Sequence, residues 1–243
     1  MADIDYWITV NGVHVPIIKG EKKSDSIKRH FEKIANKNSD IKEKQLSGDS
    51  FKDDTLFNDE MQEVGSKDFP KDVTHARDTR PISDKWRVDD THTAEDYDKR
   101  GCKCFKSEGG SVAAVDKDGD IISICRAKGD SISGEEIMAH AVKMGGTKLD
   151  SFTGNHKFYS RCGFQAVSWT PFNREHAPDG WAEANSAGLV GKEDVVFYKY
   201  VGVGKVTTGS LKSFLKNTKP FKGEDGYDKA MAYRDNSMGG KKK

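Results

Sequence analysis

The sequence predicts an α+β domain in which strands and helices follow one another along a single chain. Residues 111–126 contain two β-prone runs around Asp116-Lys117-Asp118-Gly119, whose turn-forming residues are typical of a hairpin. A helix that begins with a capping box at Ser133 and Glu136 follows this hairpin. Residues 193–201 (EDVVFYKYV) place apolar side chains on two alternating faces, which is typical of a strand.

The chain is polar and almost neutral, which excludes some classes of partner. Of its 243 residues 35% are hydrophobic and 33% are charged, and 40 basic against 39 acidic residues give a net charge of +1. Nucleic acid or an anionic membrane would favour a basic surplus, and the only basic run is Lys241–Lys243, which we interpret as a solvated tail. Residues 1–10 do not resemble a secretion signal, and no apolar run reaches transmembrane length, so we expect a cytoplasmic protein.

The four cysteines do not indicate a metal site. Cys102, Cys104, Cys125 and Cys162 form neither a CxxC pair nor a dense disulfide framework. Three aspartates at 116, 118 and 120 are similar to the start of a calcium loop, but its glycine is too early and its final glutamate is missing. We therefore expect reduced thiols, an ordinary turn and no metal.

Residues 1–36 predict a small hairpin-helix unit. Asn11-Gly12 lies between two β-prone runs, and Pro16 requires a free edge on the second strand. A helix then begins near Ser24, with apolar residues at helical spacing. A unit of this size is not stable alone, so it should pack on the later domain or on another protein.

Composition divides the remaining chain into three parts. Residues 37–85 are mostly charged and polar, and we expect a linker with one short helix near residues 54–64. Residues 86–202 form the predicted domain, and residues 203–243 form a polar tail with one amphipathic segment near Leu211 and a flexible end.

Within the domain, local signals predict each element in order. Residues 86–88 can form a first strand, and residues 93–100 predict a helix that Gly101 ends. After the hairpin, residues 133–145 predict an amphipathic helix that ends at two glycines. A short strand at 147–152, helical turns at 158–162 and strands at 165–172 and 193–201 complete the domain.

The segment between the hairpin and its helix is suited to hold an anion. It reads Arg126-x-x-Gly129-x-Ser131 and leads from an apolar strand into a helix. A helix start leaves backbone N–H groups unpaired and carries the positive end of the dipole, and small residues allow a phosphate to approach.

This segment, with Asn155, Phe158-Tyr159 and Cys162-Gly163-Phe164 after it, resembles the Gcn5-related N-acetyltransferase (GNAT) family over roughly residues 86–201. The resemblance implies a mixed, mostly antiparallel sheet flanked by helices, with acetyl-CoA as the cofactor. It assigns cofactor binding to Ile124, Cys125, Arg126, Lys128, Gly129, Ser131, Asn155 and Phe158.

The resemblance also implies catalytic roles. Tyr159 would return a proton to the departing thiolate, and a backbone N–H of residues 123–125 would bind the developing oxyanion. Glu108, Glu175 and His176 are candidates for the base, and the sequence does not rank them. Cys162 could be a nucleophile, although a buried thiol is the simpler interpretation. The aromatic segment 169–181 is either the acceptor-recognition loop or a packed covering loop.

Two functions follow from these observations. The first is an N-acyltransferase that moves an acetyl group from acetyl-CoA to an amine of a protein or small molecule. The alternative is a non-enzymatic structural or inhibitor protein with a degenerate acetyltransferase-like fold, favoured by Asp130 beside the anion loop and by the short segment 155–163. The Trp-Ile-Thr-Val-Asn-Gly start resembles segments of bacteriophage-encoded proteins, so residues 1–36 could dock a protein partner, and virion association is the alternative location.

Overall fold

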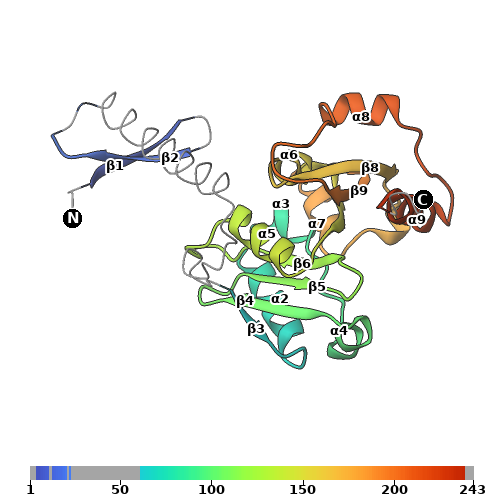
Figure 1. Ribbon diagram of the computed structural model, residues 1–243, viewed down its shortest axis with the longest axis horizontal. Coiled ribbons are helices and arrows are strands. Elements are labelled where there is room, and N and C mark those ends of the chain that lie inside the picture. Colours follow the sequence, from blue (N-terminus) through green and yellow to red (C-terminus); the bar gives the residue numbers. More distant parts are fainter. Residues whose placement is uncertain (1–3, 11–12, 21, 23–60, 239–243) are drawn as a thin grey trace, which may run out of the picture. The chain divides into compact units, whose positions relative to one another are not determined.

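The computed structural model divides the chain into two compact units, Met1–Phe57 and Asn58–Lys243. It describes residues 4–10, 13–20, 22 and 61–238 (Figure 1).

In the first unit, two strands form an antiparallel pair. β1 (Ile4–Val10) and β2 (Val13–Ile18) make a two-stranded sheet in which Trp7 lies opposite Pro16. This pairing agrees with the expected hairpin. The predicted Asn11-Gly12 turn and the helix expected from Ser24 lie outside the described residues.

The second unit contains two antiparallel sheets. The first has the strand order β3-β4-β5-β6, and the second has the order β7-β9-β8. The strands are β3 (Met61–Val64), β4 (Lys103–Ser107), β5 (Val112–Val115), β6 (Ile121–Cys125), β7 (Lys148–Phe152), β8 (Phe164–Thr170) and β9 (Val195–Tyr200). Between the sheets, the described strands share one parallel bridge, Asp120 to Lys148.

Helices flank both sheets, so the predicted mixed, mostly antiparallel fold is confirmed (Figure 1). They are α2 (Phe69–Asp78), α3 (Ile82–Lys85), α4 (Ala94–Arg100), α5 (Gly134–Lys143), α6 (His156–Arg161), α7 (Trp181–Ser186), α8 (Leu211–Asn217) and α9 (Gly226–Met238). Short 3-10 turns lie at Thr153–Asn155 and Arg174–His176.

Alternate residues of the strands in the first sheet point to opposite faces, and each face packs into a different hydrophobic core. Cys104, Val112 and Ala114 pack with α2 and α4, whereas Phe105 and Ala113 pack with α5. The second of these cores continues under β7, β8 and β9 and includes α6. The sheet is therefore covered on both faces, and the edge of β6 is left to meet β7.

The capping predictions for two helices are confirmed. In α4 the Thr93 side chain accepts a hydrogen bond from the Asp96 N–H, and the Asp96 carboxylate accepts one from the Thr93 N–H. Gly101 ends the helix in the left-handed conformation. Ser133 and Glu136 form the same reciprocal box at the start of α5. These bonds satisfy N–H groups that the helix itself leaves unpaired.

The expected linker extends too far along the chain. Residues 61–64 form the edge strand β3 rather than the end of a helix, and α2 buries Phe69, Val73 and Ala76 completely. Residues 86–88 do not form the expected strand, because Trp86 directly follows α3 and is fully buried against Phe152, at 4.8 Å between ring centroids. The folded unit therefore begins before residue 86.

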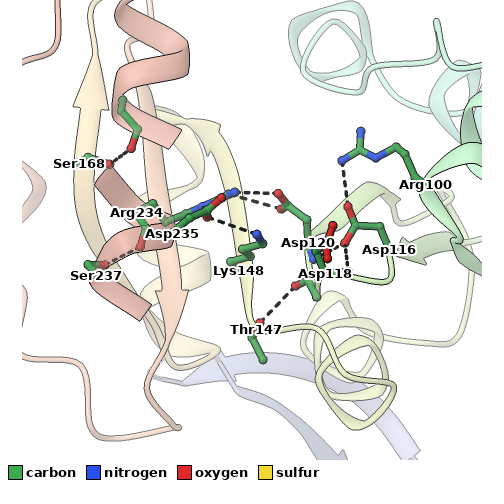
Figure 2. Close-up of polar contacts among 12 residues, drawn as sticks. Arg100, Asp116, Asp118, Asp120, Thr147, Lys148, Ser168, Arg234, Asp235 and Ser237 are labelled. Atoms are coloured by element: carbon green, nitrogen blue, oxygen red, sulfur yellow. Dashed lines mark hydrogen bonds and ion pairs between the residues drawn. The ribbon is translucent and has the colours of Figure 1, made fainter. Parts of the chain in front are cut away.

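The expected polar tail is in part a packed helix. α9 buries Ala230 and Arg234, and the Ser168 hydroxyl of β8 donates to the Ala230 carbonyl at 2.7 Å. Figure 2 shows Arg234 extending from α9 to Asp120, to which its Nη2 donates at 2.8 Å. The second carboxylate on this arginine is Asp235, which also pairs with Lys148 at 3.3 Å.

No helix in the described ranges is both long and apolar enough to cross a membrane.

We expect the replacement Arg234→Met to lower the free energy of unfolding by about 3–5 kcal/mol, because it leaves the Asp120 carboxylate buried without its cation. Urea unfolding followed by circular dichroism measures this loss. Lys229 lies on the same helix, and Lys229→Met, which removes its exposed ion pair with Asp225, should leave the free energy of unfolding nearly unchanged. Equal effects of the two variants would contradict a structural role for the buried pair.

Candidate active site

The central feature is an irregularity in β6. Val112 of β5 lies opposite Cys125, but Ala114 lies opposite Ile122, so two residues of β6 face one residue of β5. Ser123 in this bulge has a φ of 51°, and its hydroxyl lies 2.6 Å from that of Tyr97. A bulge redirects the backbone groups of its strand, and here it does so in the segment from which the oxyanion donor was expected.

A cleft opens where β6 and β7 separate. After the bridge between Asp120 and Lys148 the described residues of these two strands share no further pairing. The cleft has a volume of about 1660 Å³, and both strands, α5, α6, α9 and the segment after β8 line it. The lining of this one cleft includes residues at the start of α5 as well as residues of α9.

The loop between β6 and α5 is held by an inward-facing carboxylate. Asp130 is 6% exposed, and it accepts hydrogen bonds from the Ser107 and Ser111 hydroxyls and from the Ser111 N–H. Its second oxygen accepts from the Ile132 N–H at 3.3 Å. Burial opposes ionisation, but these donors outweigh it and lower the pKa of Asp130 to about 2. The carboxylate therefore points away from the loop's outer surface.

Other bonds fix the loop's path. The Arg126 guanidinium donates to the carbonyls of Asp130 and Ile132, both at 2.6 Å. The Lys128 N–H donates to the Thr79 hydroxyl at 2.8 Å. Gly129 has a φ of +89°, and a Cβ there would meet no atom within 4 Å. The outer side of this turn is consequently open, and only glycine adopts its backbone conformation without strain.

Tyr159 lies on the opposite wall of the cleft, on α6. Its side chain is 6% exposed and contacts the rings of Phe158 and Tyr198. Burial raises the pKa of Tyr159 to about 12, although a hydrogen-bonding contact with Ser151 acts in the other direction. The phenol therefore stays protonated at neutral pH and can donate a proton.

The structure brings most of the predicted cofactor residues to the cleft. Ile124, Cys125, Arg126, Asn155 and Phe158 line it, together with the predicted catalytic residue Tyr159. The Asn155 amide donates to the Ser151 hydroxyl at 3.0 Å and so ties the start of α6 to β7. Phe158 packs against the start of α5, where a Cβ on Gly134 would approach its ring to 3.0 Å.

The remaining predicted cofactor residues lie outside the cleft. Lys128, Gly129 and Ser131 are exposed on the outer side of the loop and do not belong to its lining. They stand next to the end where Arg126, Glu135 and Arg161 line the cleft. This place is open to a ligand group that extends from the cleft toward solvent.

The candidate bases are not assembled around the bulge. His176 is exposed at the rim of the cleft, whereas Glu175 is exposed and does not line it. Glu108 lies exposed in the turn between β4 and β5, outside the lining. The aromatic segment after β8 is packed, since Trp181 is buried against Phe172, and Phe172 also lines the cleft.

The sequence reasoning did not identify Asp150. This residue of β7 lines the cleft, and burial, with the charge of Asp120 as the next contribution, raises its pKa to about 6. Arg234 and the Tyr227 hydroxyl act in the opposite direction. A strongly perturbed acid in a cleft is a candidate for proton transfer. Nothing in the sequence around it, TKLDSF, marks it as more than a strand residue.

The cysteines are unsuited to nucleophilic attack. All four are free, and burial raises the pKa of Cys125 to about 11 and that of Cys162 to about 12. Both thiols are therefore protonated at neutral pH, and the thiolate is the reactive form. Among the described residues, no group of three or more histidines, cysteines or acids is arranged to hold a metal ion.

Comparison with known proteins gives one structural likeness. No protein-family model and no curated protein sequence matches the chain. A solved structure with similarity is the N-acetylglutamate synthase of Neisseria gonorrhoeae, complexed with coenzyme A and N-acetyl-glutamate. Its identity to this chain is 14% and the TM-score is 0.34; the match covers 58% of this chain and 35% of that one. The chain thus spans about a third of the synthase, and function is inferred from the cleft itself.

We expect Asp130→Asn to lower the free energy of unfolding by about 2 kcal/mol at neutral pH. Because the folded pKa of about 2 lies below the usual 3.8, the contribution is complete above pH 4 and is lost as the pH falls toward 2. Urea unfolding at pH 7 and pH 3 measures the difference. Asp118→Asn, at an exposed turn position, is the control. A pH-independent effect would exclude the charge as its cause.

We expect Asp150→Asn to change the free energy of unfolding in the opposite direction, so that the variant is more stable than the wild type at neutral and higher pH. The folded pKa of about 6 lies above 3.8, so the fold loses stability as the pH rises from about 4 to about 6, and the loss is complete above that range. The variant should raise the free energy of unfolding by up to about 3 kcal/mol at pH 8. This gain should disappear at pH 4 in the same urea experiment. A loss of stability at pH 8 would contradict the raised pKa.

Proposed function

We propose that the chain is an N-acyltransferase that moves an acetyl group from acetyl-CoA to an amine of a protein or small molecule. The observation that carries this proposal is the cleft between β6 and β7, with the Ser123 bulge on one wall and Tyr159 on the other. Such a cleft gives a thioester access to backbone donors, to a protonated phenol and to a second substrate from the far side.

The features of the β6–α5 loop favour the binding of a cofactor that carries phosphate groups. Within the described chain, no hydrogen bond involves the N–H groups of Gly129 and Ser131, and the space beside Gly129 is open. The Asp130 carboxylate is bonded on the inner side, so it does not occupy the surface that a pyrophosphate would approach. Arg126, Lys128 and the start of α5 supply positive potential there.

The roles of the chain's own groups follow from their chemistry. Acetyl-CoA would supply an activated acetyl group as its thioester. Backbone N–H groups of residues 123–125 are suited to donate to the carbonyl oxygen as negative charge develops on it. Tyr159 holds its proton at neutral pH and is suited to give it to the sulfur that leaves. The acceptor would be contacted by the residues after β8 that line the cleft, which are Pro171, Phe172, Asn173, His176, Ala177 and Pro178.

One observation favours the second candidate, a non-enzymatic protein with this fold. The Arg126 guanidinium donates to two carbonyls of its own loop, so these donors hold the loop rather than pointing at a ligand. In that case residues 1–36 would dock the domain to a protein partner in a larger assembly, such as a bacteriophage particle.

Thermal unfolding with coenzyme A and with acetyl-CoA separates the two candidates. We expect saturable protection, with a gain of about 3 kcal/mol when the ligand is 100-fold above its dissociation constant. Gly129→Glu should abolish the protection, because it adds a carboxylate and a side chain at a φ of +89°. Gly188→Glu, at another exposed glycine with positive φ, is the matched control and should keep it.

In the same series, Tyr159→Phe should retain protection by coenzyme A and lose about 10- to 100-fold in turnover. Absence of protection at any ligand concentration would reject the acyltransferase and favour the non-enzymatic protein.

A further inference from the structure

Four polar side chains meet where β6 and β7 separate. Asp120 directly precedes β6, Asp150 lies on β7, and Arg234 and Tyr227 come from α9. All except Arg234 line the cleft, and Arg234 is completely buried behind it. Figure 2 shows the Arg234 side chain directed at Asp120 from the α9 side.

The donors of Arg234 are committed to other carboxylates. Both of its terminal nitrogens bond Asp120, at 2.8 and 3.4 Å, and its Nε bonds Asp235 at 2.9 Å. Asp150, in contrast, makes no ion pair with any residue in the described part of the chain. Its hydrogen-bonding contact is with the Tyr227 hydroxyl, which is neutral. A carboxylate is therefore left on the cleft wall without its own cation.

The charges around Asp150 make it a site for a cation. Asp120 repels its negative form, while Arg234 and the more remote Arg100 favour that form. Tyr159 on α6 lies near enough for the Asp150 charge to act on its phenol. Burial is the largest influence, and together these groups raise the pKa of Asp150 to about 6. At neutral pH the group is ionised, and a bound cation would offset the cost of burying it.

We propose, on the basis of the acyltransferase function proposed above, that Asp150 binds the acceptor as an alkylammonium ion and takes the proton whose loss makes the nitrogen nucleophilic. The position supports this role because Asp150 and the bulged segment of β6 line the same cleft on its two separating strands.

The rim on the α9 side restricts the acceptor further. Glu224 and Asp228 line the cleft there, together with Lys222. These carboxylates repel an acceptor that carries its own carboxylate next to the amine, such as a free amino acid. The acceptor class that fits is an aliphatic primary amine without a neighbouring carboxylate: a lysine side chain or an alkyl diamine.

The protons balance as follows. The C–N bond forms as the C–S bond of the thioester breaks, and the nitrogen loses two protons in total. The first passes to the Asp150 carboxylate and then to solvent. Tyr159 protonates the leaving sulfur, and the second proton from nitrogen restores the phenol. The products are an amide, a thiol and one released proton.

Two measurements on the full chain test the assignment, with cadaverine as the probe. Calorimetric titration without acetyl-CoA should show cadaverine binding to the wild type and binding about tenfold weaker to Asp150→Asn. In turnover with acetyl-CoA, Asp150→Asn should lose about 100-fold in kcat/KM and lose the limb of the pH profile near 6. Asp89→Asn, an exposed acid that lines the same cleft outside segment 169–181, should match the wild type in both.

The outcomes separate this inference from the proposed function. Protection by coenzyme A with equal cadaverine turnover in wild type and Asp150→Asn would overturn the role of Asp150 and leave the acyltransferase intact. Better turnover with glutamate than with cadaverine would overturn the acceptor class. Lack of coenzyme A protection in the wild type would reject the acyltransferase, and the catalytic role of Asp150 with it.

Discussion

The ion pair between Arg234 and Asp120 is the interaction on which the cleft depends. It joins α9 to Asp120, the residue of the parallel bridge between β6 and β7 in the described chain, and it lies directly behind the point where the strands separate. Because the described strands of the two sheets share a single bridge, the gap between the sheets needs another connection to keep a fixed width. A buried charged pair supplies it with directional bonds, which apolar packing alone would not provide. The pair also uses the donors of Arg234, and this leaves Asp150 available to the cleft.

The two aspartates discussed above show how the same residue type acquires opposite properties. Asp130 is buried and Asp150 is partly buried in the cleft wall, and burial by itself disfavours the charged form of each. Asp130 meets hydroxyl and backbone donors, and its charge becomes a means of shaping a loop. Asp150 meets a second carboxylate and a neutral hydroxyl, and its charge remains unsatisfied. The first belongs to the scaffold, whereas the second has the character of a reactive group.

Structural features that depend on residues close together in the chain could be predicted from the sequence. The caps at Thr93 and Ser133 and the hairpin turn at 116–119 form from bonds within a few positions, so their patterns could be recognised directly. Elements that depend on distant partners were missed. β3 and α2 carry few apolar residues and are stabilised by strands that follow much later, and α9 buries an arginine, which no apolar periodicity reveals. Asp150 could not be recognised from the sequence for the same reason, because the groups that surround it are Asp120 and residues of α9, which are distant in the chain.

The anion loop and the β4–β5 turn form one unit, because the Asp130 carboxylate fits against Gly109. A methyl group on Gly109 would collide with that carboxylate, and the two serines that bond it, Ser107 and Ser111, lie on either side of this glycine. Neither segment can therefore diverge alone during evolution. Among homologous chains, residues 107–111 should covary with position 130, and a larger residue at 109 should accompany a smaller or uncharged one at 130. Substitutions in the β4–β5 turn would thus alter the loop between β6 and α5 without any change in that loop's own glycine and serine.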